Sequence, residues 1–308
     1  MKILSSAPPW VSRSISTVPQ SARYQQGVTL LELLIGITIG LLVVAVATSA
    51  LMVSRGVSGT VSDASIIQQQ AAYAMRVIGL QLRQAGSLYL NPNPTGITSE
   101  KNYMQPVAFE AQAINLTEPT ESFDPAKNTI SATTNSLLTG FSRYKDQVYG
   151  SATETSLMRN CLGGPKDEST SFIIQSEFKF DDTKLELRCN GNSAGEQPIL
   201  QNVAEFQWRY LVQDIPVTNP GAATIQYTST APTDLNKIQA IEVCLVLFGA
   251  ETIDMPAGSK YTGCAQETDG TDKKVDMTSL TGTRKNRMHM RFRNVFQIRS
   301  QGTTTPPI

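Results

Sequence analysis

The sequence predicts an α+β arrangement of elements: one long N-terminal helix, with a membrane half and an amphipathic half, packed against an antiparallel β-sheet head. Two patterns predict the helix, an apolar run over 28–53 and apolar residues recurring every three or four positions beyond it. Alternation of apolar and polar residues in the second half of the chain predicts the strands. These patterns divide the chain into five segments: a basic leader (1–27), the membrane half of the helix (28–53), its amphipathic half (54–86), a variable loop-rich connecting region (87–164) and a disulfide-bearing head (165–308).

The composition argues against two broad classes of protein. The 308 residues carry a formal net charge of zero with 17% charged residues, unlike a generally basic nucleic-acid binder or a disordered acidic tail. Four cysteines lie in the second half, without a CxxC, and the chain has one histidine. An even cysteine count without zinc-site spacing favours disulfides and, for an exported segment, an oxidising compartment.

The apolar run over 28–53 exceeds the roughly 20 residues that span a bilayer, and Glu32 is its single charge. The preceding residues 1–27 hold three basic side chains and no acidic one, which keeps that side in the cytoplasm and directs the head outward. A secretory signal peptide would be cut after its apolar stretch, whereas here Gly27-Val28 forms a boundary in front of it. A plain signal anchor is the alternative.

Gly27, followed by Val28-Thr29-Leu30-Leu31-Glu32 and the apolar run, resembles the class III signal of type IV prepilins and type II secretion pseudopilins. The resemblance implies that a prepilin peptidase cuts between Gly27 and Val28 and methylates the new amine of Val28. It also makes Glu32 the glutamate at the fifth position of the mature chain. Val28 stands where phenylalanine is usual in this family.

A carboxylate within a membrane span is costly and points to a functional partner. No Lys or Arg occurs from Val28 to Ser54, so the available cation is the α-amino group released at Val28, on the same or a neighbouring subunit. Such a pair would fix the axial register of subunits, because another stagger leaves both groups unpaired. The alternative is a protonated Glu32 near a lipid headgroup. Gly36 and Gly40 form a GxxxG pattern, which permits close helix approach.

An apolar stripe continues beyond the membrane half. Its members are Val57, Val61, Ala64, Ile67, Ala71, Ala74, Ile78, Leu82 and Ala85. We expect a sheet to cover this stripe, and Gly86 to end the helix before Pro92. A free coiled coil is the alternative, but the stripe is rich in alanine and lacks flanking charge pairs.

The head contains four stretches with strand character. Residues 172–180 and 184–189 predict a hairpin that turns at Asp181-Asp182, and 238–248 predicts a central strand buried on both faces. The stretches 206–212 and 288–298 alternate between apolar and polar side chains, which predicts strands with one buried face.

The head also resembles the PilW-type minor pilins. The residues concerned are Leu185-x-Leu187-Arg188-Cys189, Gln197 to Val203, Phe206-x-Trp208-x-Tyr210, Ile241-Glu242-Val243-Cys244-Leu245 and Phe292-Arg293-Asn294-Val295-Phe296. The resemblance implies a minor pilin that joins other minor and major pilins to prime or cap a type IV pilus used in twitching motility, adhesion or DNA uptake. It implies residence in the inner membrane with a periplasmic head, contact with the pilus assembly platform, and then a place at the pilus tip. The alternatives are a J-type minor pseudopilin of type II secretion and a bitopic receptor or adhesin.

The cysteines allow three pairings. We favour the local pairs Cys161–Cys189 and Cys244–Cys264 over crossed pairings or free thiols. Each bond would stabilise the fold by about 3 kcal/mol on the chain-entropy account.

No motif for enzymatic chemistry, a cofactor or a metal is recognised, so we expect a non-enzymatic protein. His289 lies among arginines on an alternating strand, which predicts an exposed or interface position. Asp269, Asp272 and Asp276 depart from EF-hand spacing and predict a solvated acidic loop rather than a cation site.

A cluster of cations near the C-terminus is the weakest candidate site. It comprises Arg284, Lys285, Arg287, Arg291 and Arg293, with Arg299 beyond. Such a patch can bind the phosphates of nucleic acid, and the alternative is a strand face that pairs with acidic side chains.

Overall fold

The computed structural model describes residues 27–90, 109–110, 123–145, 155–166, 171–192, 194–214 and 224–299. All of the leader except Gly27 lies outside these residues. The chain forms two compact units, Met1–Ser54 and Arg55–Ile308, and each is described by itself.

Helix α1 (Leu30–Gln84) contributes to both units. Its 55 residues correspond to about 83 Å of helix at 1.5 Å per residue. Gly86 follows the helix with a φ of 76°, in the left-handed region that glycine adopts without a Cβ penalty. The Gly86 N–H donates to the Gly140 carbonyl at 2.9 Å, which ties the end of the helix to the head. The long helix expected from the sequence is therefore present.

In the first unit, every residue of α1 from Leu30 to Ser54 is exposed. Among the described residues, α1 is the one helix that is long and apolar enough to cross a membrane. Apolar side chains surround the helix in this unit, so it has no distinct polar face.

The described residues of the second unit form two larger antiparallel sheets, a separate hairpin and a short antiparallel pair of β1 (Tyr89–Leu90) with β2 (Phe109–Glu110). The four-stranded sheet has the order β13-β10-β8-β9, from β8 (Val203–Asp214), β9 (Thr224–Thr228), β10 (Ile238–Thr252) and β13 (Arg287–Gln297). The five-stranded sheet runs in chain order through β3 (Ile130–Ala132), β4 (Ser136–Ser142), β5 (Ile173–Asp181), β6 (Glu186–Gly191) and β7 (Glu196–Leu200). The hairpin consists of β11 (Lys260–Gln266) and β12 (Asp272–Asp276). Short elements complete the described fold: α2 (Pro125–Asn128), η2 (Leu235–Lys237) and η3 (Gly282–Arg284).

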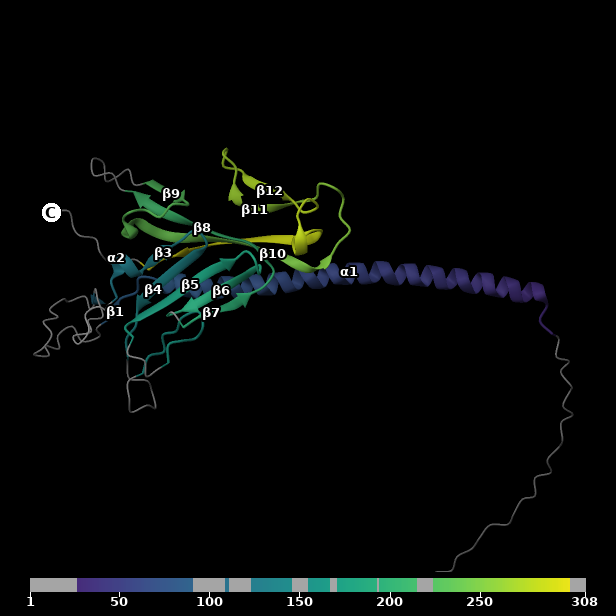
Figure 1. The fold of residues 1–308 in the computed structure, drawn as a ribbon, viewed down its shortest axis with the longest axis horizontal. Helices are drawn as coiled ribbons and strands as arrows, with labels where there is room; N and C mark the ends of the chain where they lie inside the picture. Colours follow the sequence, from purple (N-terminus) through teal and green to yellow (C-terminus); the bar gives the residue numbers. More distant parts are fainter. Residues whose placement is uncertain are drawn as a thin grey trace, which may run out of the picture. The chain divides into compact units, whose positions relative to one another are not determined.

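One hydrophobic core joins the second-unit part of α1 to both sheets, whose strands lie beside that part of the helix in Figure 1. The helix contributes Ile67, Ala71, Ala74, Ile78 and Leu82. The sheets contribute large side chains, among them Phe178, Leu187, Tyr210, Ile241, Leu245 and Phe296. The small alanines on the helix face let these larger groups approach closely, and the combination gives the α+β head that the sequence predicts.

Strand β10 is buried on both faces, as its nearly continuous apolar sequence predicts. Ile241, Val243 and Leu245 face the main core, while Val246 and Phe248 face a smaller cluster with Tyr261 of β11. β10 also lies between β8 and β13, so its backbone is hydrogen-bonded on both edges. It is the central strand of the head.

The predicted hairpin of 172–180 and 184–189 is confirmed by the pairing of β5 with β6. Asp181 shapes its turn, because Oδ1 of Asp181 accepts the N–H groups of Thr183 (3.2 Å) and Lys184 (3.0 Å).

Two features differ from the expectations. The five-stranded sheet takes β3 and β4 from the segment 87–164, so the sheet begins before the boundary drawn at residue 165. The apolar stripe is covered only from Asp63 onward, because Val57 and Val61 are 59% and 65% exposed. Both differences arise because the sheets include more of the chain, and cover less of the helix, than expected. Periodicity along the chain does not show how far a sheet extends.

Candidate assembly site

The start of α1 is closed by a reciprocal capping arrangement between Thr29 and Glu32. The Thr29 N–H and hydroxyl both donate to Oε2 of Glu32, at 3.0 and 2.9 Å. In return the Glu32 N–H donates to the Thr29 hydroxyl oxygen at 3.2 Å. This is the capping box, in which the N-cap residue and the residue three positions later satisfy each other's backbone donors. The sequence analysis missed it, although Thr29-Leu30-Leu31-Glu32 carries its signature.

The capping box leaves half of the Glu32 carboxylate available. Among the described residues, every hydrogen bond to Glu32 reaches Oε2, so Oε1 remains open to a further donor. Glu32 is the only charged side chain from Val28 to Ser54, and Arg55 is the first base after it. A carboxylate with this orientation can accept a cation supplied from outside its own helix.

The Gly27–Val28 bond lies just before α1, outside any helix or strand. Val28 is 72% exposed, and nothing lies within 4 Å of where a Cβ on Gly27 would be. Gly36 and Gly40 have equally open surroundings. Among the described residues, nothing therefore blocks the access of a protease to this bond.

In the second unit, α1 is anchored to the head by a buried carboxylate that the sequence analysis did not single out. Asp63 is only 4% exposed and accepts the Glu251 N–H at 2.8 Å. A Cβ on Gly249 would lie 2.4 Å from Oδ2 of Asp63, so the missing side chain makes the approach feasible. The contact falls where the β10–β13 register shifts, and such a bulge frees a backbone N–H from the ladder.

A second close approach lies further along the helix. A Cβ on Gly79 would lie 2.4 Å from a ring carbon of Phe296, so glycine is needed for β13 to pack this tightly. Near the end of the helix, the buried Ser176 hydroxyl donates to Oε1 of Gln81 at 2.8 Å. That hydroxyl also accepts the Cys161 N–H at 3.0 Å, which links α1, β5 and the segment 155–166.

Both disulfides join the local pairs that the sequence favours. Cys161 is bonded to Cys189 with a Cα–Cα distance of 6.4 Å, and Cys244 is bonded to Cys264 with one of 5.7 Å. The first ties the segment 155–166 to β6, and the second ties the hairpin of β11 and β12 to the central strand β10. Each bond therefore holds a peripheral segment against a sheet.

The cation cluster is largely engaged within the head. Arg291 pairs with Asp272 at 2.7 Å, and Arg293 contacts Asp272 at 3.3 Å and Glu242 at 3.5 Å. Arg287 donates to the Gly249 carbonyl at 3.1 Å. Side-chain hydrogen bonding and charge from Arg291 hold the pKa of Asp272 below its usual range. This arrangement favours a structural role for these arginines over phosphate binding.

The expectation of an exposed or interface position for His289 is wrong, because the imidazole is buried within the head. His289 is 8% exposed and stacks on Tyr261, with 4.5 Å between ring centroids and 10° between planes. Burial lowers the pKa of His289, and burial together with the neighbouring Glu205 carboxylate raises the pKa of Tyr261. The alternation along β13 correctly separates two faces, but the β11–β12 hairpin covers the face that sequence reasoning assigned to solvent.

Among the residues that the structure describes, no group of three His, Cys, Asp or Glu side chains is placed to hold a metal ion. The side chains of Asp269 and Asp276 instead accept hydrogen bonds from Thr271 and Thr278, at 2.6 and 2.7 Å from their hydroxyls. These acids stabilise turns.

Comparison with known proteins identifies the N-terminal segment. Residues 22–48 match the prokaryotic N-terminal methylation motif. No curated protein matches the chain. Among solved structures, a type IV-like pilin from Thermus thermophilus is similar over 76% of this chain and 97% of its own, with 11% sequence identity and a TM-score of 0.35. The chain therefore carries a prokaryotic N-terminal methylation motif that includes the start of its long helix α1.

Proposed function

We propose that this chain is the precursor of a type IV pilin-like subunit and that it acts as a minor pilin. The observation that carries the proposal is the methylation motif over residues 22–48, with Glu32 as the one charge in the apolar half of α1. Cleavage between Gly27 and Val28 would create an α-amino group four residues before Glu32. The mature chain would then begin with the cation that the apolar half of its helix otherwise lacks.

The geometry at Thr29 and Glu32 supports this role. Oε2 of Glu32 closes the helix cap, and Oε1 is open to a donor from a neighbouring subunit. In an apolar filament core, an amine and a carboxylate stabilise one another only when the subunits have the matching axial stagger. Glu32 would thus set subunit register without giving up its capping contact.

The surface of α1 supports packing against other subunits. Leu30 to Ser54 is exposed on all sides, and in the second unit Ile66, Tyr73 and Leu80 form an exposed apolar line with seven-residue spacing. Residues seven apart lie two turns apart on the same helix face. We propose that other minor and major pilins cover these apolar groups in the assembled filament.

The head supports a periplasmic location and a role in partner choice. Two disulfides stabilise it, and such bonds persist in oxidising compartments. We propose that the protein resides in the inner membrane, is processed by a prepilin peptidase, engages the assembly platform and reaches the pilus tip. The residues that resemble PilW-type minor pilins favour a complex that primes or caps the filament.

The N-terminus of the mature protein tests the proposal. The chain is purified from cells with and without a prepilin peptidase, and its N-terminal peptide is measured by mass spectrometry. We expect a methylated Val28 only when the peptidase is present, with Gly27→Ile blocking the cut. Retention of residues 1–27 in peptidase-containing cells would contradict the proposal and favour a bitopic receptor.

Assembly is tested separately with Glu32→Ala, and Glu32→Gln serves as the matched polar variant. We expect normal cleavage of both but much lower recovery in sheared filaments, since neither side chain can pair with a cation. Wild-type recovery of Glu32→Ala would overturn the register argument. Deletion of the gene separates a pilus role, which predicts loss of twitching, from a J-type pseudopilin, which predicts loss of secretion.

A further inference from the structure

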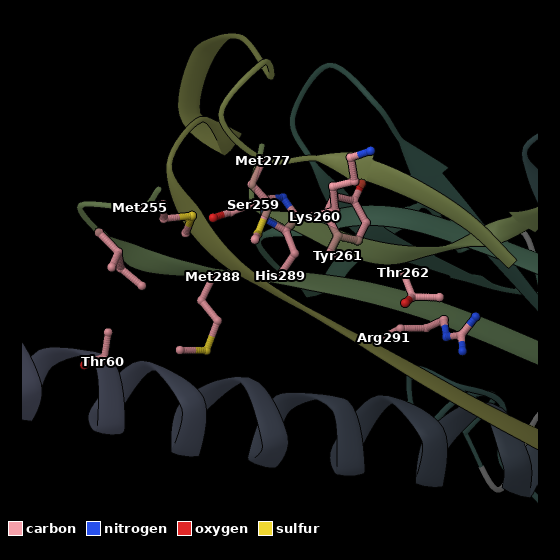
Figure 2. A pocket seen from close by; sticks show the side chains of 11 residues that line it. Thr60, Met255, Ser259, Lys260, Tyr261, Thr262, Met277, Met288, His289 and Arg291 are labelled. Carbon is pink, nitrogen blue, oxygen red and sulfur yellow. The ribbon is translucent and has the colours of Figure 1, made fainter. Parts of the chain in front are cut away.

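A cavity of about 700 Å³ lies beside the Tyr261–His289 stack, within the second unit. Figure 2 shows its lining: the β10–β11 connection supplies Met255, the β12–β13 connection supplies Met277, and β13 supplies His289. None of its lining residues has a carboxylate or a thiol. The assembly function proposed above does not use this cavity.

The imidazole of His289 is held in one orientation and one tautomer. Its Nδ1 lies 2.8 Å from the Arg287 carbonyl oxygen, and a carbonyl only accepts, so Nδ1 carries the proton. Nε2 therefore presents a lone pair, and among the described residues this buried atom has no hydrogen-bond partner. A histidine whose other nitrogen donates to a backbone carbonyl is the arrangement that orients a metal ligand.

Two thioethers share the cavity with this imidazole. Met255 and Met277 both line it, and in Figure 2 the sulfur of Met277 is turned toward the His289 ring. Met288 also lines the cavity, but it neighbours His289 on β13, where successive side chains point to opposite faces. The neutral soft donors that line this pocket beside Tyr261 are therefore one imidazole nitrogen and two flexible thioethers.

Neutral nitrogen and thioether donors select a particular class of ion. Thioethers favour soft cations such as Cu(I), whereas Mg²⁺ and Ca²⁺ prefer oxygen ligands and structural Zn²⁺ sites use thiolates or several imidazoles. A nearby acid offsets part of the cation's charge, because the Tyr261 hydroxyl stacked beside His289 is bonded to Oε1 of Glu205 at 2.9 Å. Among the lining cations, Arg291 is already paired with Asp272 at 2.7 Å. We propose that His289, Met277 and Met255 form a binding site for a single Cu(I) ion.

The test uses the full-length protein in detergent, freed of metal by a chelator, with Cu(I) kept reduced by ascorbate. A coloured Cu(I) chelator competes for the metal, so its loss of absorbance reports binding. We expect one Cu(I) per chain in the wild type and at least tenfold weaker binding in His289→Phe. X-ray absorption of the complex should show sulfur and nitrogen neighbours around copper.

Two further variants keep the proposal falsifiable. Met255→Leu combined with Met277→Leu preserves apolar volume and should also weaken binding at least tenfold. Met290→Leu, on the same strand but outside the cavity lining, should bind as the wild type does. Retained binding by both the His289 variant and the double variant, or absence of binding by the wild type, would overturn the proposal. Because processing at Val28 plays no part in this assay, failure here leaves the assembly proposal standing.

Discussion

The two halves of α1 share one helix but differ in what surrounds them. From Leu30 to Ser54 every residue is exposed, whereas the second-unit half buries one face built from residues such as Ile67, Ala74 and Ile78. Apolar side chains surround the first half, whereas those of the second half lie among charged and polar residues and form one stripe. The difference teaches that the second half is stabilised by packing within its own unit, whereas the side chains of the first half remain exposed.

The largest expected effect contrasts two isoleucines on this helix. Ile78 is fully buried and Ile37 is 55% exposed. We expect Ile78→Ala to lower the free energy of unfolding of the head by about 2–5 kcal/mol, because a buried methyl-rich side chain leaves a cavity. Ile37→Ala should change it by less than about 0.5 kcal/mol. Urea unfolding in detergent, followed by Trp208 fluorescence in the chain without Trp10, measures both; equal effects would break the comparison.

Two glycines of α1 sharpen the comparison, because helix propensity alone predicts that replacing either one by alanine stabilises the helix. A Cβ on Gly40 meets nothing within 4 Å, so Gly40→Ala should favour the helix by up to about 1 kcal/mol. Gly79→Ala should destabilise the head by about 1–3 kcal/mol, because its Cβ would overlap the Phe296 ring. Helicity by circular dichroism and urea unfolding separate the two effects. A stabilised Gly79→Ala head would show that β13 packs less tightly than the structure indicates.

Asp63 tests whether the second half is held by a specific polar contact as well as by burial. Asp63→Ala should cost about 1–2 kcal/mol, since the Glu251 N–H loses its charged acceptor. Asp63→Asn keeps an acceptor oxygen and should recover most of that loss. Amide hydrogen exchange at Glu251 provides the local measurement. Unchanged protection in Asp63→Ala would mean that packing alone anchors the helix here.

The smallest effect concerns pH, in metal-free protein. Burial holds the pKa of His289 below its unfolded value of about 6.5, although the Glu205 carboxylate opposes this and the Arg284 cation adds to it. The unfolded chain therefore binds the extra proton first, so stability should fall as pH drops below about 6.5 and be flat above it. The slope from one proton is at most about 1.4 kcal/mol per pH unit. In His289→Phe, the urea midpoint of unfolding should change less between pH 7 and pH 5 than it does in the wild type. An unchanged pH dependence would mean that other titrating groups cause it.

The sequence by itself determined the elements whose cause is local. The apolar run, the hairpin turn at Asp181 and the doubly buried strand β10 all follow from side-chain type and spacing. Backbone propensity, capping and burial periodicity act over a few residues, so they can be read along the chain.

Only the tertiary structure decided which groups meet across the fold. Periodicity placed His289 on the polar face of its strand, but strand β11, more than 20 residues away in sequence, covers that face and buries the imidazole. Three other features likewise depend on segments that are distant in sequence. They are the pairing of β3 and β4 with β5, the contact of Asp63 with Gly249, and the contact of Gly79 with Phe296. Close packing depends on two surfaces at once, so the sequence of one strand or helix does not identify the element that packs against it.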